Sequence, residues 1–293
     1  MIVTIHNDQL TLTADTLGAQ MQSITSYKGT EYLWNGDERY WKGRAPVLFP
    51  FVARLKDKTY TVHGGTYQMK IHGFASACEF EVAEQTESRV TFVLRDNEVT
   101  RAQFPFAFLF KVRYALKEST VEVTYTVDNP EDEMLHFGLG GHPGFNVPLK
   151  EGTSFEDYYL RFSQPCEPDR VGFSSEILVS GVDKRYELEG GQIIRLRHDL
   201  FDHDAIVLKN MAKSVTIASD KTKRYVTVSY PQMPYVGFWH AERKDAPYVC
   251  IEPWVSLPAR DGVVEDFACK GDLIHLPGHG SYENTWYITI GEE

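Results

Sequence analysis

The sequence predicts an all-β protein, built as a large antiparallel β-sandwich. Apolar and polar residues alternate in many short runs, which is the pattern of strands with one buried face. Turn-forming residues interrupt these runs at short intervals, and helical periodicity is scarce. Because strands and helices do not alternate along the chain, the pattern does not favour a parallel α/β sheet.

The strand-like runs are distributed along most of the chain. Apolar residues alternate with polar ones in Val121–Val127, and Asp128-Asn129-Pro130 then ends the run. Leu196–Phe201 is the one segment that suggests a helical turn. Similar strand-like runs are Glu79–Val82, Arg89–Leu94, Phe108–Tyr114, Ser214–Ile217, Tyr225–Tyr230 and Thr285–Ile290. Turn signals are Asn35-Gly36-Asp37, His63-Gly64-Gly65, Asp183-Lys184 and Gly190-Gly191.

The organisation of the chain favours one domain over residues 1–293. No linker, low-complexity tract or internal repeat divides it, and 42% hydrophobic residues are ample for a large core. The Pro/Gly-rich stretch Leu139–Pro148 is the obvious candidate for a boundary. Strand-like sequence continues on both sides of it, so we interpret it as a functional loop inside the domain.

Charge and cysteine content exclude several classes of partner. The formal net charge is −11 and no Lys/Arg run forms a basic stripe, so neither nucleic acid nor an anionic membrane is expected as a partner. No apolar segment approaches the roughly 20 residues of a membrane span, and the first residues do not resemble a signal peptide. The 4 scattered cysteines predict reduced thiols and a cytoplasmic location.

Motifs for several cofactor chemistries are absent. The chain has no Walker loop, no Gly-x-Ser-x-Gly elbow and no His-Glu-x-x-His, and Pro143 occupies the place of the third glycine of a dinucleotide fingerprint. His63, His72 and His142 could converge with Glu252, but no compact metal-ligand motif is present. We therefore expect neither a metal nor an organic cofactor.

Four segments place a polar group among residues that should be buried. Each has a structural explanation when taken alone, such as a paired arginine or a hydrogen-bonded core histidine. The four groups are Arg54 at the end of an apolar run, His72 before Gly73, His142 in the glycine-rich segment Phe137–Phe145, and Glu252 after the apolar run Tyr248–Ile251.

Taken together and in this order, the four segments resemble the aldose 1-epimerase (galactose mutarotase) family. Leu17-Gly18-Ala19-Gln20 also looks like the opening of that family. The resemblance implies a β-sandwich that interconverts the α and β anomers of a small aldose sugar without a cofactor. Gly144 and Trp254 stand where well-known members usually have Tyr and Gln, so the chain resembles a divergent bacterial branch of the family.

The resemblance also implies a role for each site residue. Glu252 is the expected general base and His142 the general acid, placed on opposite sides of the sugar ring. Such a pair can remove the proton of the C1 hydroxyl and protonate the ring oxygen. The expected substrate-binding residues are Arg54 and His72, which stabilise developing charge, Asp204 with Asp202 as its alternative, and Trp254, whose ring offers a face to the sugar.

Two alternatives remain open at this stage. A hexose-6-phosphate 1-epimerase on the same fold would require a basic cluster at the rim of the pocket, formed by Lys42, Arg44 and Lys56. A non-catalytic sugar-binding protein would need hydrogen-bonding groups but no acid–base pair. The presence of both His142 and Glu252 argues against that second alternative.

Overall fold

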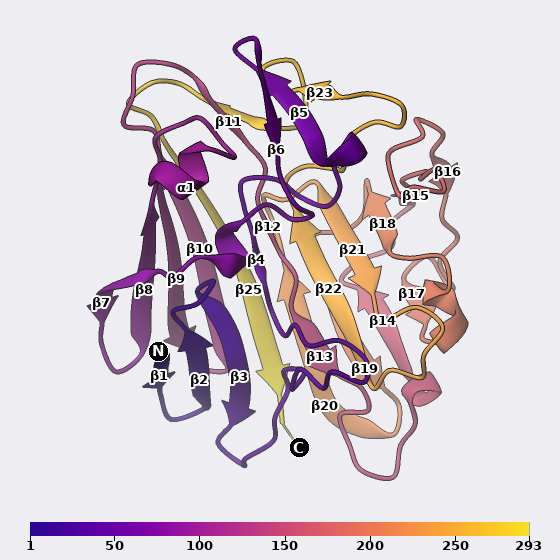
Figure 1. Cartoon of the computed structure of the whole chain (residues 1–293). Helices are drawn as coiled ribbons and strands as arrows, with labels where there is room; N and C mark the ends of the chain where they lie inside the picture. Colours follow the sequence, from indigo (N-terminus) through magenta and orange to yellow (C-terminus); the bar gives the residue numbers. More distant parts are fainter. Residues whose placement is uncertain (293) are drawn as a thin grey trace.

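The computed structural model describes residues 1–292 and consists mainly of two large antiparallel sheets, as the sequence predicts. Figure 1 shows their strands in the colours of the sequence. The nine-stranded sheet runs in the order β17 (Ile193–Arg195), β14 (Tyr158–Phe162), β19 (Ser214–Ser219), β20 (Thr222–Ser229), β25 (Ser281–Gly291), β10 (Thr120–Asp128), β9 (Leu109–Lys117), β8 (Arg89–Arg95) and β7 (Glu81–Gln85). The eight-stranded sheet contains β16 (Lys184–Arg185), β15 (Asp169–Arg170), β18 (Ile206–Lys209), β21 (Tyr235–Trp239), β22 (Tyr248–Trp254), β12 (Gly140–Gly141) and β4 (Val47–Leu48), with β13 (Gly144–Asn146) also paired to β22.

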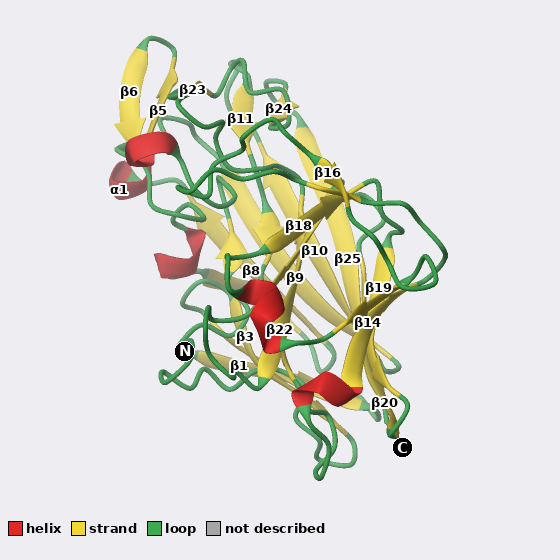
Figure 2. Cartoon of the chain, turned by 90° about the vertical axis from the view of Figure 1, so that its right-hand side faces the viewer, coloured by secondary structure: helices red, strands yellow, loops and turns green. Residues whose placement is uncertain are grey.

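Smaller sheets and short helices lie around these two layers, and Figure 2 shows the helical segments outside the sheets. The additional strands are β1 (Ile2–His6), β2 (Leu10–Asp15), β3 (Gln20–Ser26), β5 (Thr59–Val62), β6 (Gly65–Gln68), β11 (Leu135–Phe137), β23 (Glu265–Asp266) and β24 (Ile274–Leu276). The helical segments are α1 (Glu98–Arg101) and 3-10 turns at Lys56–Lys58, Ala75–Ala77, Phe155–Asp157 and His198–Phe201. Within residues 1–292, no helix is long and apolar enough to cross a membrane.

Most of the predicted strands agree with the structure, and two local predictions need correction. The run Glu79–Val82 coincides with β7 only from Glu81 onward. The sequence predicts a turn at Asp183-Lys184, but Lys184 belongs to the short strand β16, where it lies opposite Arg170 of β15. A two-residue strand is too short to show a period, so turn-forming residue types dominate the local pattern.

The alternation of residues along β22 determines where the candidate site lies. Val249 and Ile251 belong to the same hydrophobic core as Val123 of β10, so this face of β22 packs toward the nine-stranded sheet. Successive side chains of a strand point to opposite faces, so Cys250 and Glu252 point away from that core. The outer face of the eight-stranded sheet therefore carries the site.

The hydrophobic core draws residues from nearly the whole chain, from Val3 in β1 to Ile290 in β25. The residues on either side of the glycine-rich segment Leu139–Pro148 contribute to the same core, since Phe137 and Val147 both belong to it. On this basis we propose that the chain folds as a single domain.

Candidate active site

A cavity of about 350 Å³ lies on the outer face of the eight-stranded sheet. Asp202, the alternative to Asp204, lines an adjoining cavity and not this one. The structure thus brings all the sequence-predicted site residues to one place and favours Asp204 over Asp202. The predicted residues that line the cavity are Arg54, His72, His142, Asp204, Glu252 and Trp254.

Glu252 lies within β22 and is 2% exposed. Its register partner on β21 is Gly237, so no side chain faces the carboxylate from the neighbouring strand. The carboxylate points instead toward His142, whose Nε2 lies 3.3 Å from Glu252 Oε2. Within residues 1–292 no Lys or Arg pairs with this carboxylate, and a fully buried glutamate without such a partner is rare.

His142 follows β12 on a backbone that packs too closely for side chains. A Cβ on Gly141 would lie 2.6 Å from the ring of Trp286, so only glycine fits there. The backbone N–H of His142 donates to the carbonyl of Pro46 at 3.2 Å, and its ring stacks on Trp41 with 4.9 Å between centroids. His142 Nδ1 is buried without a hydrogen-bond partner among the described residues.

Burial shifts the pKa values of His142 and Glu252 in opposite directions. Desolvation raises the pKa of Glu252 well above its ordinary value, and the charge of Asp204 adds to this rise. Desolvation also lowers the pKa of His142 well below its ordinary value, with a further contribution from His72. Both shifts favour the uncharged forms, so the empty pair holds one proton over a wide pH range.

His72 lies beside His142, with 5.4 Å between the ring centroids. Its backbone is left-handed (φ 65°), and Gly73 follows at φ 77°, where a Cβ would lie 2.2 Å from the carbonyl oxygen of Phe49. The backbone N–H of Ala53 donates to His72 Nδ1 at 3.2 Å, which leaves Nε2 as the donor of the neutral ring. Burial lowers the pKa of His72 to about 4, so this ring is a neutral donor.

Arg54 and Asp204 form the more open wall of the cavity. Arg54 is 45% exposed, and its guanidinium lies 3.8 Å from Asp204 Oδ2. Asp204 Oδ1 accepts a hydrogen bond from the backbone N–H of Ala205 at 2.8 Å. Most of the donors of Arg54 are therefore free to meet a ligand that carries hydroxyl or anionic oxygen atoms.

The aromatic walls of the cavity extend beyond what sequence reasoning identifies. Trp254, expected as a platform for the sugar, lines it, and Trp239 and Trp41 add two further indoles. Trp254 Nε1 is buried without a partner among the described residues. The cavity therefore combines aromatic faces with a few polar groups, which suits a sugar ring.

A donor set suitable for a metal is also present at the floor of the cavity. Atoms of His142, Cys250 and Glu252 lie within 4.8 Å of one another. Burial raises the pKa of the Cys250 thiol and of the Glu252 carboxyl, which opposes the deprotonation that metal binding requires. His63, which sequence reasoning considers as a further member, does not line the cavity and lies 3.5 Å from Glu133.

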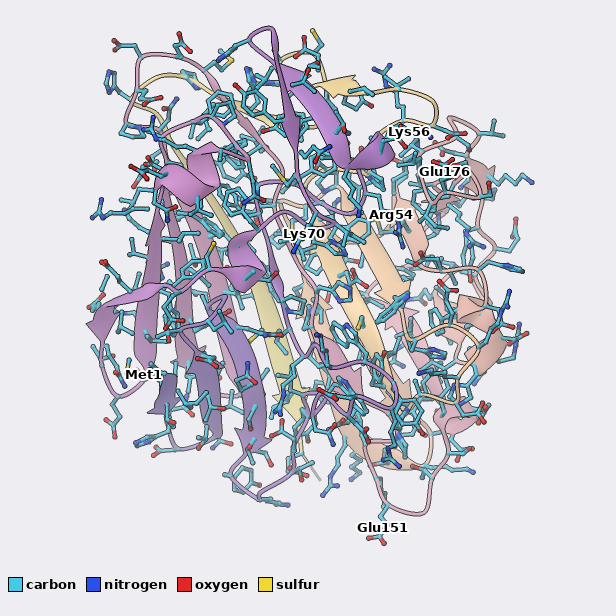
Figure 3. All side chains as sticks on the ribbon, in the orientation of Figure 1. Met1, Arg54, Lys56, Lys70, Glu151 and Glu176 are labelled. Atoms are coloured by element: carbon cyan, nitrogen blue, oxygen red, sulfur yellow. The ribbon has the colours of Figure 1, made fainter. Side chains whose placement is uncertain are left out.

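The basic residues expected for a phosphate site do not converge at this cavity. Arg44 donates to the carbonyl of Gln22 at 2.7 Å, and Lys56 forms an ion pair with Glu176 at 2.8 Å (Figure 3). Neither these two residues nor Lys42 lines the cavity. The cluster that the hexose-6-phosphate alternative would require from these three residues is therefore not formed at this cavity, because the first two already have partners in the fold.

Comparison with known proteins places these features in a family. A sequence model described as Aldose 1-epimerase matches residues 1–259. Protein LacX (chromosomal) of Lactococcus lactis subsp. lactis is 33% identical over 266 residues, which cover 88% of each chain.

Two solved structures are similar over nearly their whole length. A galactose mutarotase related enzyme from Lactobacillus acidophilus has a TM-score of 0.95 and 34% identity, over 100% of this chain and 98% of the other. A galactose mutarotase-like protein from Lactobacillus casei has a TM-score of 0.92 and 31% identity, over 99% of this chain and 100% of the other.

Proposed function

The chain belongs to the aldose 1-epimerase family, and on this premise we propose that it interconverts the α and β anomers of an aldose. The observation that carries the proposal is the buried contact between His142 Nε2 and Glu252 Oε2, 3.3 Å apart in a cavity with sugar-binding character. A protein that only bound sugar would gain nothing from burying this pair.

The short distance between His142 and Glu252 favours a mechanism in which both groups act on the same part of the sugar ring. In an aldose, the C1 hydroxyl oxygen and the ring oxygen are both bonded to C1. A base and an acid that serve these two atoms can therefore be neighbours, as His142 and Glu252 are. We therefore propose that the two groups act side by side, in place of the expected arrangement on opposite sides of the ring.

The proposed cycle conserves its single proton. When the sugar binds, the one proton of the pair moves across the 3.3 Å contact from Glu252 to His142, which leaves Glu252 ionised. Glu252 then takes the proton of the C1 hydroxyl while the bond between C1 and the ring oxygen breaks, and His142 delivers its proton to that oxygen. The open-chain aldehyde rotates about its C1–C2 bond, and closure on the other face returns both protons. His72 Nε2–H and Arg54 are placed to donate to oxygen atoms that gain charge on ring opening.

Asp204 and Trp254 are proposed to bind the sugar itself. The carboxylate of Asp204 accepts hydrogen bonds from hydroxyl groups, and the indole of Trp254 lies against the apolar face of the ring. No cofactor is needed, since each step is a proton transfer. The four cysteines are free thiols, which supports the proposal of a cytoplasmic location.

The test is a mutarotation assay with freshly dissolved single anomers of several aldoses. We expect the approach to anomeric equilibrium to accelerate in proportion to protein concentration for at least one of them. Sugar binding that is measurable by calorimetry, without acceleration for any aldose tested, would contradict the proposal in favour of a binding protein.

A further inference from the structure

We infer that a cluster of three histidines outside the candidate active site binds a divalent cation of the kind that prefers imidazole ligands, such as Zn²⁺. His136 and His275 are the two primary ligands, and His63 is the third. None of the three lines the cavity that holds His142 and Glu252. The inference therefore concerns a second site and does not depend on the proposed function.

Three segments that are far apart in the sequence bring these histidines together. His136 of β11 and His275 of β24 are directly opposed register partners in a two-stranded antiparallel sheet. His63 lies in the turn between β5 and β6, and its ring centroid is 6.4 Å from that of His136. Figure 1 shows β5, β6 and β11 at the same end of the molecule. An ion held here would link all three segments.

The Nδ1 atoms of His136 and His275 face each other at 2.6 Å. Neutral rings at this distance share one hydrogen, so one Nδ1 donates and the other presents a lone pair. Two imidazoles on one tetrahedral Zn²⁺ have their ligand nitrogens about 3.3 Å apart, so the rings need to separate by roughly 0.7 Å. His275 is only half-buried, which gives its ring room for this movement.

Burial keeps His136 in the form that binds a metal. The residue is 5% exposed, and desolvation lowers its pKa to about 4, with further contributions from His275 and His63. A metal ligand must be deprotonated, and this ring is neutral at physiological pH. Metal binding then requires only that the shared hydrogen moves to the Nε2 atom of the same ring, and no proton is lost.

The surroundings of the cluster carry negative charge. Glu133 Oε2 lies 3.5 Å from His63 Nδ1, which leaves Nε2 as the ligand atom of that ring. A carboxylate beside the outer nitrogen of a ligating histidine is a common arrangement around protein-bound metals. The charge of Asp266 also reaches His136, and it favours positive charge there. The cluster therefore suits a cation and disfavours an anion.

A second histidine pair in the molecule shows the contrast. His240 Nδ1 donates to the carbonyl of Ala241 at 2.8 Å, so its Nε2 accepts from His198 Nδ1 at 3.1 Å. His240 is 0% exposed, and the ring of Phe155 stacks on His198. Among residues 1–292, no third histidine ring packs on this pair. Hydrogen bonding and burial therefore account for His198 and His240 without an ion.

The experiment titrates Zn²⁺ into the metal-free whole chain and follows binding by calorimetry and by thermal denaturation. We expect one ion to bind per chain. The melting temperature should rise by roughly 4 to 8 °C when free Zn²⁺ exceeds its Kd about 100-fold, because the ion binds the folded cluster.

Two variants test the ligands. His275→Gln should abolish both effects of Zn²⁺, because only one primary ligand remains. Asparagine tolerates the left-handed backbone at residue 63 (φ 51°), so His63→Asn should fold. It should weaken Zn²⁺ binding by roughly 10-fold or more, since loss of even an outer partner of a ligand has an effect of that size.

His279→Gln is the matched control, because His279 follows β24, is exposed and pairs with Asp132 at 2.8 Å. It removes a histidine from the same segment without touching the cluster, so Zn²⁺ binding should remain parental. His142→Asn is the control for the donor set at the floor of the cavity, and it should also leave Zn²⁺ binding unchanged.

The outcomes either support the site or overturn it. Absence of Zn²⁺ binding, or binding that survives in His275→Gln, would overturn the inference, and His136 and His275 would then share only a hydrogen bond. Binding that is lost in His142→Asn would place the ion in the cavity and overturn it as well. If His275→Gln failed to fold, His63→Asn would decide, since unchanged affinity in that variant contradicts a three-histidine site. None of these measurements uses mutarotation, so the proposed function is tested separately.

Discussion

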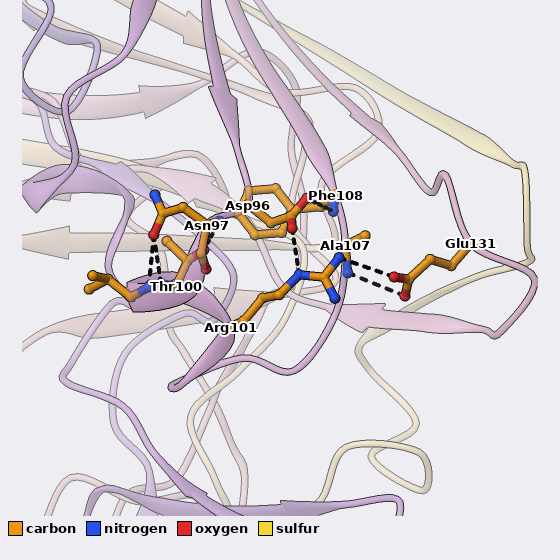
Figure 4. Close-up of polar contacts among 8 residues, drawn as sticks. Asp96, Asn97, Thr100, Arg101, Ala107, Phe108 and Glu131 are labelled. Atoms are coloured by element: carbon orange, nitrogen blue, oxygen red, sulfur yellow. Dashed lines mark hydrogen bonds and ion pairs between the residues drawn. The ribbon is translucent and has the colours of Figure 1, made fainter.

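Charged groups are treated in opposite ways at two places in this molecule. At the corner beside α1, Arg101 donates to Asp96 at 2.5 Å and to Glu131 at 3.1 Å, and all three side chains reach solvent (Figure 4). At the floor of the cavity, His142 and Glu252 are buried and face each other at 3.3 Å. Among residues 1–292, no arginine or lysine forms an ion pair with Glu252.

The two places differ in how completely their charged groups are paired, and this difference helps to distinguish structural from functional charges. At the α1 corner, the Asp96 carboxylate also accepts a hydrogen bond from the backbone N–H of Phe108 at 3.2 Å. Such a network can form in any fold and contributes little at a surface. The cavity leaves His142 Nδ1 without a partner and shifts both pKa values. Incomplete pairing in a buried place is typical of a site that awaits a ligand.

The largest expected effect comes from Glu252→Gln. The amide keeps the shape of the side chain but cannot accept the C1 proton, so turnover should fall by about 100- to 10,000-fold. His142→Asn should reduce it by a similar factor. The double variant should lie close to the slower single variant, because the two groups act in one cycle.

Glu265→Gln sharpens this comparison as a matched control. Glu265 is 1% exposed like Glu252, but it is paired with Arg260 at 2.9 Å. We expect a lower melting temperature with parental turnover, whereas Glu252→Gln should lose turnover without a lower melting temperature. If both variants lost stability and neither lost activity, the cavity carboxylate would be structural.

A smaller effect is expected from His72→Asn. Asparagine tolerates the left-handed backbone of this position, so the fold should survive the substitution. Loss of the Nε2–H donor should lower kcat/KM by roughly 10- to 100-fold, as loss of a hydrogen bond to a charged group does. A drop in activity explained entirely by a smaller folded fraction, measured by thermal denaturation, would show that His72 only packs.

The pH dependence follows from the two opposite shifts. The active pair holds one proton, so activity is lost when a second proton binds or when the last one leaves. Burial opposes the charged form of His142, which places the acidic limb below the ordinary histidine pKa of 6.5. Burial also opposes ionisation of Glu252, which places the alkaline limb above the ordinary pKa of 4.5.

A profile of kcat/KM measured on the best aldose should therefore show a broad plateau across neutral pH. A narrow optimum with its acidic limb at or above pH 6.5 would mean that the pair is not desolvated as the structure indicates. The α1 corner should contribute nothing to this profile, which an Arg101→Gln variant can verify.

Arg101→Gln should change stability only slightly. Arg101 is 46% exposed and its partners Asp96 and Glu131 are 20% and 43% exposed, and pairs that reach solvent typically contribute about 1 kcal/mol or less. Urea denaturation should detect a small destabilisation that shrinks as salt concentration rises, with turnover unaffected. A loss of several kcal/mol would mean that the corner is a structural element of the core.

The smallest expected effect on activity is that of removing metal ions with a chelator. Although His142, Cys250 and Glu252 could approach a metal ion, proton transfer requires none. Dialysis against a strong chelator should leave mutarotation unchanged, as measured on the same sugar before and after treatment. Activity that disappeared and returned only with added zinc would contradict a metal-free mechanism.

The predicted site residues line one cavity, and each of them carries a local signal in the sequence. Glu252 interrupts an apolar run, and glycines beside His72 and His142 indicate a tightly constrained backbone. The choice between Asp202 and Asp204 is different. Two residues of a regular strand would share a face, and only the left-handed backbone of Asp204 (φ 70°) distinguishes them.

Other parts of the site depend on contacts between distant segments. Trp41 stacks on His142 because a loop is held by the bond from Trp34 Nε1–H to the carbonyl of Trp41 at 2.8 Å. This arrangement leaves no period or motif that could be detected in the sequence.

Strand β25 has a consequence for how the protein matures. It lies between β20 and β10 and follows all the other strands in the sequence, so the nine-stranded sheet remains in two halves until residues 281–291 are synthesised (Figure 1). Each half then exposes an edge that can pair with another chain, which makes the unfinished polypeptide prone to aggregation. Trp286 of β25 also packs against Gly141, next to His142. His142, the proposed acid, therefore acquires its support last, and we expect activity to emerge only at the final stage of folding.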